Sequence, residues 1–324
     1  MRPLFTATAL LPVLASILSA AGPEQAFQPW SSVTPPPLHI LAGGKIVTTT
    51  NASMNLDRGI SAQAIYLVNV PVEVAEQTLL AFDSSKHPEL GTIQHHRFHD
   101  EKDAAFETLR LDANIAACAV LLRSARDPKQ FQMARDEVAR IPGDQTAESI
   151  RQFLVSILRQ RWTRFFQQGD LGSVRTYDAR GEIQTLLREE PRITGHFAAL
   201  LAPLTAKTGI GTPRLSYWDL SEVDKTGTIA LGALYAGGTA GRRQFLDLTY
   251  YASSGYNSSM ALYELVPVTV NGKPATLVWH GCLVSSTELA GGFGIKRKIA
   301  AGFIASDLEK AIRAFRSDAE RAGR

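Results

Sequence analysis

The sequence FLDLTYYA, residues 245–252, alternates between two kinds of side chain with a period of two residues. Successive side chains of an extended chain point to opposite faces, so this period separates an apolar set from a more polar set. The first face carries Leu246, Leu248 and Tyr250, and the second carries Asp247, Thr249 and Tyr251. The pattern is typical of a half-buried antiparallel strand, and it predicts a sheet with one well-covered face.

Three further segments predict neighbouring strands. Residues Thr228–Tyr235 precede the first strand, and Ser259–Val266 and Thr276–Ser285 follow it. The glycine-rich stretch Ala236–Arg242 predicts a flexible hairpin connection. The dipeptide Asn271-Gly272 predicts a tight turn between the last two strands, because it tolerates positive φ at both central positions of a turn. Together these segments predict an antiparallel meander.

The periodicity changes after the loop Gly291-Gly292-Phe293-Gly294. Apolar residues then recur at steps of three to five residues, and they are Ile295, Ile299, Phe303, Leu308, Ile312, Phe315 and Ala319. We expect them to line one stripe of a long helix. A helix with one apolar stripe packs on the nearest apolar surface, which here is the sheet. The predicted fold class is therefore α+β.

The N-terminal residues predict export. Arg2 supplies a positive end, Leu4–Leu18 an apolar core and Ser19-Ala20-Ala21 a cleavage site, so residues 1–21 are typical of a secretory signal peptide. A membrane anchor is the alternative, but the apolar run is shorter than the ~20 residues of a spanning helix. We expect a periplasmic or secreted protein, with an extended proline-rich leader at residues 22–45 and an ordered domain at residues 46–324.

The charge balance argues against one class of partner. A formal net charge of +3 is too small to support binding to nucleic acid. Membrane contact is compatible with the sequence, without a spanning segment once the signal peptide is removed. After export, Cys118 and Cys282 would meet oxidising conditions, where a disulfide between them and two buried thiols are both consistent with the sequence.

Segments near both ends of the chain carry a family resemblance. They are Val70-Pro71-Val72-Glu73-Val74-Ala75, Leu80-Ala81-Phe82-Asp83, His87-Pro88-Glu89-Leu90 and Gly291-Gly292-Phe293-Gly294-Ile295-Lys296-Arg297. In these segments the chain resembles START-like proteins of the helix-grip (SRPBCC-type) superfamily. The resemblance implies a curved antiparallel sheet that wraps the long C-terminal helix and encloses a cavity for an apolar ligand.

The middle of the chain differs from that pattern. It is similar to an uncharacterised group of exported bacterial proteins at Leu215-Ser216-Tyr217-Trp218, Tyr251-Ala252-Ser253 and Asn257-Ser258-Ser259. Residues 127–207 predict helices where a START-like domain would continue its sheet. Their longest apolar stripe consists of Ile150, Phe153, Leu154, Ile157, Leu158, Trp162, Phe165 and Phe166. We expect an inserted helical subdomain, which either fills or caps the cavity or packs as ordinary core.

The preferred hypothesis is a non-enzymatic binding or carrier protein for a lipid-like or other apolar small molecule, with a cavity larger than ~300 Å³. Aromatic and polar side chains of the predicted sheet, with one lysine after the glycine loop, are the candidate ligand contacts. They are Tyr217, Trp218, Leu248, Tyr250, Tyr256, Asn257, Trp279, His280 and Lys296. The glycine loop and Lys296 would also suit an acidic head group at a helix start. We predict no cofactor and no metal.

Two alternatives stay open. An enzyme could use His280 with Cys282, or the cluster of potential zinc ligands at His95-His96-Arg97-Phe98-His99. The sequence contains no H-E-x-x-H, and the K-T-G tripeptides at Lys207 and Lys225 have no S-x-x-K partner. A structural or protein-interaction module would instead show a filled core and an exposed apolar patch on the helices of residues 127–207.

Overall fold

The computed structural model describes residues 27–51, 54–98, 104–144, 146–167, 179–205, 211–239, 241–290 and 294–324. The predicted signal peptide, His99, the tripeptide that begins at Lys207 and the first three residues of the glycine loop lie outside the described residues. None of the helices within these ranges is long and apolar enough to span a membrane.

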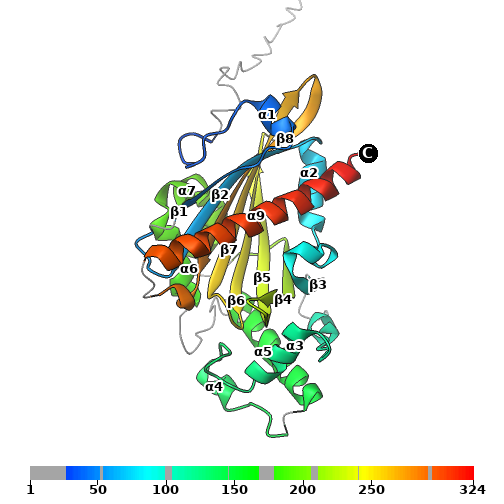
Figure 1. Ribbon diagram of the computed structural model, residues 1–324, viewed down its shortest axis with the longest axis vertical. Coiled ribbons are helices and arrows are strands. Elements are labelled where there is room, and N and C mark those ends of the chain that lie inside the picture. The colour runs from blue at the N-terminus through cyan, green and yellow to red at the C-terminus, as the bar shows by residue number, and fades with distance from the viewer. Residues whose placement is uncertain are drawn as a thin grey trace, which may run out of the picture.

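The described strands form one curved antiparallel sheet of eight strands in the order β1-β2-β8-β7-β6-β5-β4-β3 (Figure 1). Their bounds are β1 Val47–Asn51, β2 Gly59–Val68, β3 Thr92–Phe98, β4 Leu215–Val223, β5 Thr226–Thr239, β6 Arg242–Ala252, β7 Ser258–Val270 and β8 Lys273–Ser285. From β4 to β8, each strand pairs with the next one along the chain, which confirms the predicted meander. Strand β2 pairs with β8 and places β1 at the edge.

One predicted turn of the meander is confirmed by the structure, and one predicted loop is shorter than expected. Asn271 and Gly272 have φ of 52° and 74°, so they form the predicted tight turn between β7 and β8. The stretch Ala236–Arg242 is not a flexible loop, because Ala236 pairs with Phe245 and Thr239 pairs with Arg242. Strands β5 and β6 stay paired through this glycine-rich stretch nearly to the turn. The pairing needs only backbone hydrogen bonds, so the lack of side chains does not prevent it.

Helices lie on both faces of the sheet. The α-helices are α1 Leu38–Ala42, α2 Val72–Ala81, α3 Ala116–Ser124, α4 Arg135–Val138, α5 Ala147–Gln167, α6 Ala179–Glu189, α7 Pro191–His196, α8 Ala198–Thr205 and α9 Gly294–Ala322. Short 3-10 helices are η2 Ser84–Lys86, η3 Pro88–Leu90, η4 Ala104–Thr108 and η5 Thr287–Leu289. Helices α9 and α2 pack on one face, and α3, α5, α6, α7 and α8 pack with the apolar side chains of the other.

The long C-terminal helix crosses the sheet and contacts β1 and β2 (Figure 1). Its buried residues are Ala301, Leu308, Ile312, Phe315 and Ala319, which pack with β2 residues such as Tyr66 and with α2. The predicted packing of this helix on the sheet is therefore confirmed.

The predicted stripe is wrong in its N-terminal half, because Ile299 and Phe303 are 56% and 67% exposed. The step of five residues from Phe303 to Leu308 turns by about 140° in a helix of 3.6 residues per turn, so the two residues face different sides. The buried stripe continues instead through Ile304 and Ala301.

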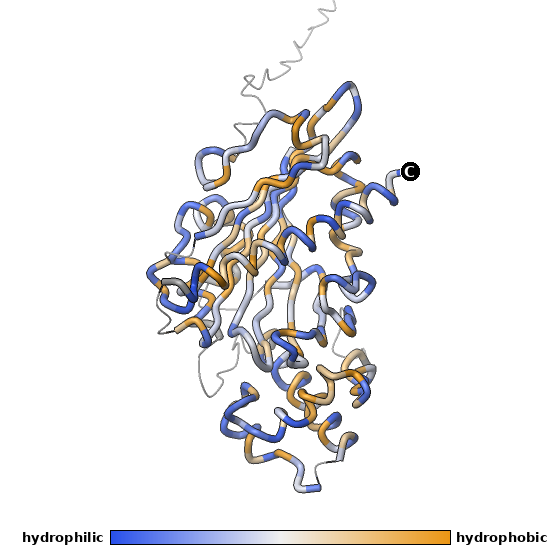
Figure 2. The backbone as a smooth tube through the Cα atoms, in the orientation of Figure 1, coloured by the Kyte–Doolittle hydropathy of each residue, from blue (hydrophilic) through white to orange (hydrophobic). Residues whose placement is uncertain are grey.

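The helical subdomain covers the face of the sheet opposite α9. Phe165 of α5 stacks on Tyr250 of β6 with ring centroids 3.7 Å apart, and Phe197, between α7 and α8, packs against Trp279 of β8. The helices begin earlier than predicted, at Ala116. They lie on the face opposite α9, so they do not fill the space between α9 and the sheet, and they build the largest of the three apolar clusters of the described residues. Figure 2 shows hydrophobic and hydrophilic segments alternating along these helices.

The described part of the proline-rich leader differs from the extended segment that the sequence predicts. Phe27, Trp30, Val33 and Leu41 are buried in the core on the helical-subdomain side, and α1 forms before Ile46. The Trp30 ring lies 4.4 Å from the Trp279 ring, measured between centroids. Prolines prevent long regular structure, but they do not prevent scattered aromatic side chains from packing on a sheet.

The two cysteines are free thiols in the structure. Cys118 is buried on α3 in the core of the helical-subdomain side, and Cys282 lies on β8 in register with Ala62 of the α9 side. The sheet therefore separates them, which excludes a disulfide in this fold.

Candidate ligand-binding site

The central strands present two very different rows of side chains. One row runs across four strands through Ala233, Leu248, Met260 and Leu283, and all of them are buried and apolar. The adjacent row on the α9 side runs through Leu234, Asp247, Ala261, Cys282 and Ala62. On this side Asp247 and Thr249 of β6 and Ala261 and Tyr263 of β7 are only partly buried, whereas Phe245 and Leu265 are buried. We call the α9 side of these central strands the α9-side surface.

Polar side chains gather on the α9-side surface. They are His95 and Arg97 of β3, Tyr217 and Asp219 of β4, Asp247 and Thr249 of β6, Ser259 and Tyr263 of β7, and His280 and Cys282 of β8. Tyr256, from the loop after β6, joins them, because its pKa is raised first by burial and then by the charges of Asp219 and Asp247. Helix α9 lies along β1 and β2 at one side of this surface, and Arg97 of the edge strand β3 lies at the other side.

Tyr217 reaches Asp247 across a neighbouring strand. Its hydroxyl donates to Asp247 Oδ1 at 2.5 Å and lies 3.4 Å from Thr249 Oγ1. The ring crosses β5 at Gly232, where a Cβ would meet the ring at 2.0 Å, so any other residue at this position would displace Tyr217. Burial raises the pKa of Asp247 to about 6, although the hydrogen bond from Tyr217 opposes the shift.

His95 bridges Arg97 and Asp219. Arg97 Nε lies 2.9 Å from His95 Nε2, and His95 Nδ1 lies 2.6 Å from Asp219 Oδ1. A guanidinium can only donate, so Arg97 is the donor of the first contact. Burial lowers the pKa of Arg97, whose Nη1 also donates to the carbonyl of Leu80 at 2.8 Å.

His280 and Cys282 share the α9-side surface but do not form a reactive pair. Burial lowers the pKa of His280 to about 3 and raises the pKa of Cys282 to about 11. The imidazole stacks on Tyr263 with ring centroids 4.0 Å apart. A thiol with a raised pKa is a poor nucleophile at neutral pH, because the thiolate is the reactive form. The geometry therefore does not favour the enzyme hypothesis built on these two residues.

The predicted histidine cluster is divided by the strand. His95 faces the α9-side surface, whereas His96 faces the other side and stacks near Trp218 at 6.0 Å. His99 lies outside the described residues. Within the described ranges, no group of three or more histidine, cysteine, aspartate or glutamate residues is placed to hold a metal ion.

The nine predicted contact residues do not form one site. Tyr217, Tyr256 and His280 lie on the α9-side surface, as described above. Four others are buried with the helical subdomain on the opposite face, and they are Trp218, Leu248, Tyr250 and Trp279. Asn257 is buried at the end of the sheet, where its Nδ2 lies 3.3 Å from Glu182 Oε1 of α6. Lys296 is exposed, and its Nζ donates to the carbonyl of Glu288.

The sequence reasoning missed the polar residues that lie beside Tyr217, above all Asp247, Asp219 and Arg97. Asp247 belongs to the polar face of the segment that decided the fold, and that face was treated as solvent-exposed. Its small neighbours Ala261, Cys282 and Ala62 come from other strands, so only the register of the folded sheet shows that they continue its row.

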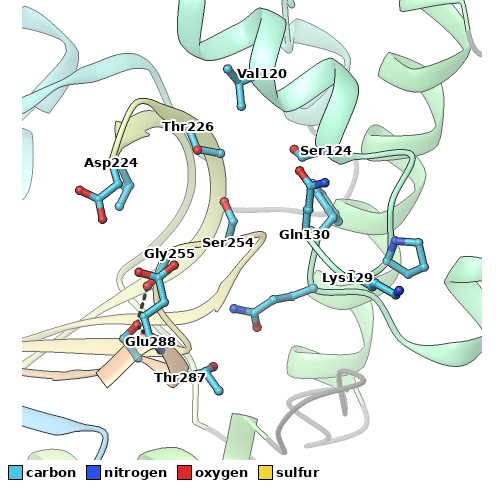
Figure 3. A pocket seen from close by; sticks show the side chains of 15 residues that line it. Val120, Ser124, Lys129, Gln130, Asp224, Thr226, Ser254, Gly255, Thr287 and Glu288 are labelled. Atoms are coloured by element: carbon cyan, nitrogen blue, oxygen red, sulfur yellow. Dashed lines mark hydrogen bonds between the residues drawn. The ribbon is translucent and has the colours of Figure 1, made fainter. Parts of the chain in front are cut away.

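A cleft of about 430 Å³ lies at the end of the sheet (Figure 3). Ser124 and Gln130, from α3 and the loop after it, face Thr226, Ser254 and Thr287 at the strand ends. Its polar lining suits water or a small polar molecule more than an apolar one. It therefore does not match the ligand class that the sequence predicts.

Comparisons with known proteins add little to this geometry. No protein-family model matches the sequence, and a search of curated proteins found no significant match. Among solved structures, the chain is similar to a START superfamily protein from Mycobacterium smegmatis, with 14% identity over 36% of this chain and 72% of that chain. The TM-score of 0.26 is too low to carry an argument about the ligand or the activity.

Proposed function

We propose that this protein binds a small molecule with an apolar body and a polar group, and that the ligand lies on the α9-side surface beside helix α9. One observation carries the proposal. The middle of the sheet is covered by tightly packed apolar side chains on one face, whereas the other face keeps Asp247, Thr249 and Cys282 partly accessible next to small residues.

The chemistry of this surface supports a binding role. A face selected only for stability would be apolar beneath a helix, because burying a polar group without a partner is unfavourable. Binding sites for small molecules instead combine an apolar lining with a few polar groups that orient the ligand. Ala261 and Ile304 supply partly buried apolar side chains on this side, and Tyr217 with Asp247 supplies a preorganised polar pair.

Binding of a neutral apolar dye tests the proposal. N-phenyl-1-naphthylamine should bind the wild-type protein with enhanced fluorescence, because its rings would leave water for the α9-side surface. Ala261→Trp should weaken this binding about tenfold or more, since the new indole would occupy the space above the row of Asp247. The measurement is a fluorescence titration with circular dichroism to verify folding.

Thr269→Trp is the matched control. Thr269 lies on the same strand but is exposed and far along the hairpin, so this variant should bind the dye as the wild type does. Absence of dye binding by the wild type, or equal binding by the folded Ala261→Trp variant, would contradict the proposal.

The proposal includes a location outside the cytoplasm, supported by the charge and hydrophobicity pattern of residues 1–21. Protein recovered from the periplasm or the medium should begin just after Ala21 when its N-terminus is sequenced. An uncleaved chain confined to the cytoplasmic fraction would contradict this part of the proposal.

A further inference from the structure

Asp247 is placed to pair with a group that the described residues do not provide. Only its Oδ1 takes part in a described hydrogen bond, from the neutral hydroxyl of Tyr217. Its neighbours in register are Leu234 on β5 and Ala261 on β7, which are apolar. No ion pair joins this carboxylate to a cation among the described residues. The second oxygen therefore remains available on a partly accessible surface.

No cation of the described residues forms an ion pair with Asp247. Arg97 is the nearby cation, and its Nε and Nη1 are engaged by His95 and by the Leu80 carbonyl. A second carboxylate, Asp219, lies near Asp247 and is hydrogen-bonded to His95. Asp83, also near this group, has its own cation, because Lys86 Nζ lies 3.3 Å from Asp83 Oδ2.

His280 supplies a second and independent sign of a missing partner. This residue is only 5% exposed, and its Nδ1 has no hydrogen-bond partner in the part of the chain that the structure describes. It lies on β8, two residues from Cys282 and on the same side of the sheet. A buried ring nitrogen without a partner is unfavourable unless water or a ligand satisfies it. Asp247 and His280 are therefore two polar groups of the α9-side surface that lack a full set of partners among the described residues.

We propose that the ligand carries a protonated amine that pairs with Asp247, with its apolar body lying over Ala261 beside α9. This inference rests on the proposed function and names the chemical class of the ligand. A cation would supply the ion pair that Asp247 lacks among the described residues, and the attraction of a cation to a carboxylate is strong where little water screens it. A carboxylate ligand would instead be repelled by Asp247 and Asp219, and an alcohol would gain only a hydrogen bond.

Three ligands of equal chain length test the inference. Dodecylamine, dodecanol and dodecanoate are titrated against the dye complex of the full mature chain at pH 7.5, below their aggregation limits. The amine should displace the dye about tenfold more effectively than the alcohol, and the carboxylate should be the weakest of the three. Asp247→Asn should remove the preference for the amine while the dye and the alcohol still bind.

Asp224→Asn is the control for the general effect of removing one negative charge. Asp224 lies in the turn between β4 and β5, at the end of the sheet, and it should keep the preference for the amine. Equal displacement of the dye by the three ligands, or a preference for the amine that survives Asp247→Asn, would overturn the proposal that the ligand carries an amine. Failure of the dye itself to bind would overturn the proposed function, so the two failures are distinguishable.

The pH profile gives a further readout. Burial raises the pKa of Asp247 to about 6, so the advantage of the amine should decrease as the pH falls through about 6 and the carboxylate takes up a proton. The profile should be flat in this range for Asp247→Asn. The other titratable and charged groups that face this carboxylate are His95, Arg97, Tyr217, Asp219, Tyr256, Tyr263 and Cys282.

Discussion

The two faces of the same sheet differ in what they bury. On the helical-subdomain face, large apolar and aromatic side chains fill the interior, as in the stack of Phe165 on Tyr250. On the α9-side surface, neighbouring residues of the same strands are small or polar and remain partly accessible, as at Asp247 and Ala261. The difference indicates that one face supplies most of the stability and leaves the other free to bind.

Buried charge follows the same division. On the helical-subdomain side, Arg161 of α5 pairs with Glu137 of α4 at 2.7 Å, and the two side chains are 1% and 0% exposed. Arg161 also lies over the Tyr251 ring, 4.3 Å from its centroid. On the α9 side, Asp247 has no such cation. The charged residues in the core of the helical-subdomain side therefore form an ion pair with each other, whereas Asp247, at the proposed ligand site, has no ion pair among the described residues.

The largest expected effect is the loss of the buried pair. Arg161→Leu should lower the free energy of unfolding by about 3–5 kcal/mol, because Glu137 would remain charged and buried without its partner. Urea unfolding followed by tryptophan fluorescence measures this change. The double variant Glu137→Leu with Arg161→Leu should recover much of the loss, since no charge then remains buried. A loss below 1 kcal/mol in the single variant would show that water reaches this side.

A pair of adjacent residues gives the next largest effect. Leu248→Ala should lower the free energy of unfolding by about 2–5 kcal/mol, because it opens a cavity in the core of the helical-subdomain side. Thr249→Ala, one residue along β6 and on the α9-side surface, should lower it by less than about 1 kcal/mol. Both values come from urea unfolding under the same conditions. Equal losses would mean that the two faces are equally packed, contrary to the comparison above.

The smallest effect depends on pH. The pKa of Asp247 is about 6 in the folded protein and near its ordinary value of 3.8 when unfolded, so folding favours the protonated acid. Its contribution to stability is complete below about pH 4 and is lost as the pH rises through about 6. Asp247→Asn should therefore raise the free energy of unfolding by about 1–2 kcal/mol at pH 7.5, with partial solvent screening included, and have little effect at pH 4.

Unfolding curves at the two pH values check this sign. A stabilisation of the same size at both would show that the carboxylate is not perturbed in the folded state. Destabilisation at pH 7.5 would show that Asp247 is held by a cation of the protein itself, and it would weaken the case for a cationic ligand.

Local sequence patterns predicted where the strands and helices lie better than they predicted which side chains are buried. The alternation in residues 245–252 and the turn at Asn271 were sufficient for the meander, because strand periodicity and turn geometry depend on nearby residues. The same local reasoning placed Phe303 in the buried stripe of α9 and failed, because a step of five residues was accepted as helical. It also treated residues 27–45 as a leader, since nothing nearby showed that Trp30 packs on Trp279.

The candidate site was predicted only in part for a related reason. Tyr217, Tyr256 and His280 were selected for their chemistry, and they lie on the α9-side surface. Trp218, Leu248, Tyr250 and Trp279 were selected with them, because an aromatic residue in a strand has the same appearance in the sequence whether it faces a ligand or a core. Only the register between distant strands shows that Asp247, Ala261 and Cys282 form one row.

The sequence by itself determined the strands of the meander, the long C-terminal helix and the α+β class, because these depend on the spacing of apolar residues along the chain. The tertiary structure decided which face of the sheet each helix covers and which polar residues meet across strands. These properties depend on contacts between segments far apart in the chain, where burial and pairing set the pKa of Asp247 and the partner of Tyr217.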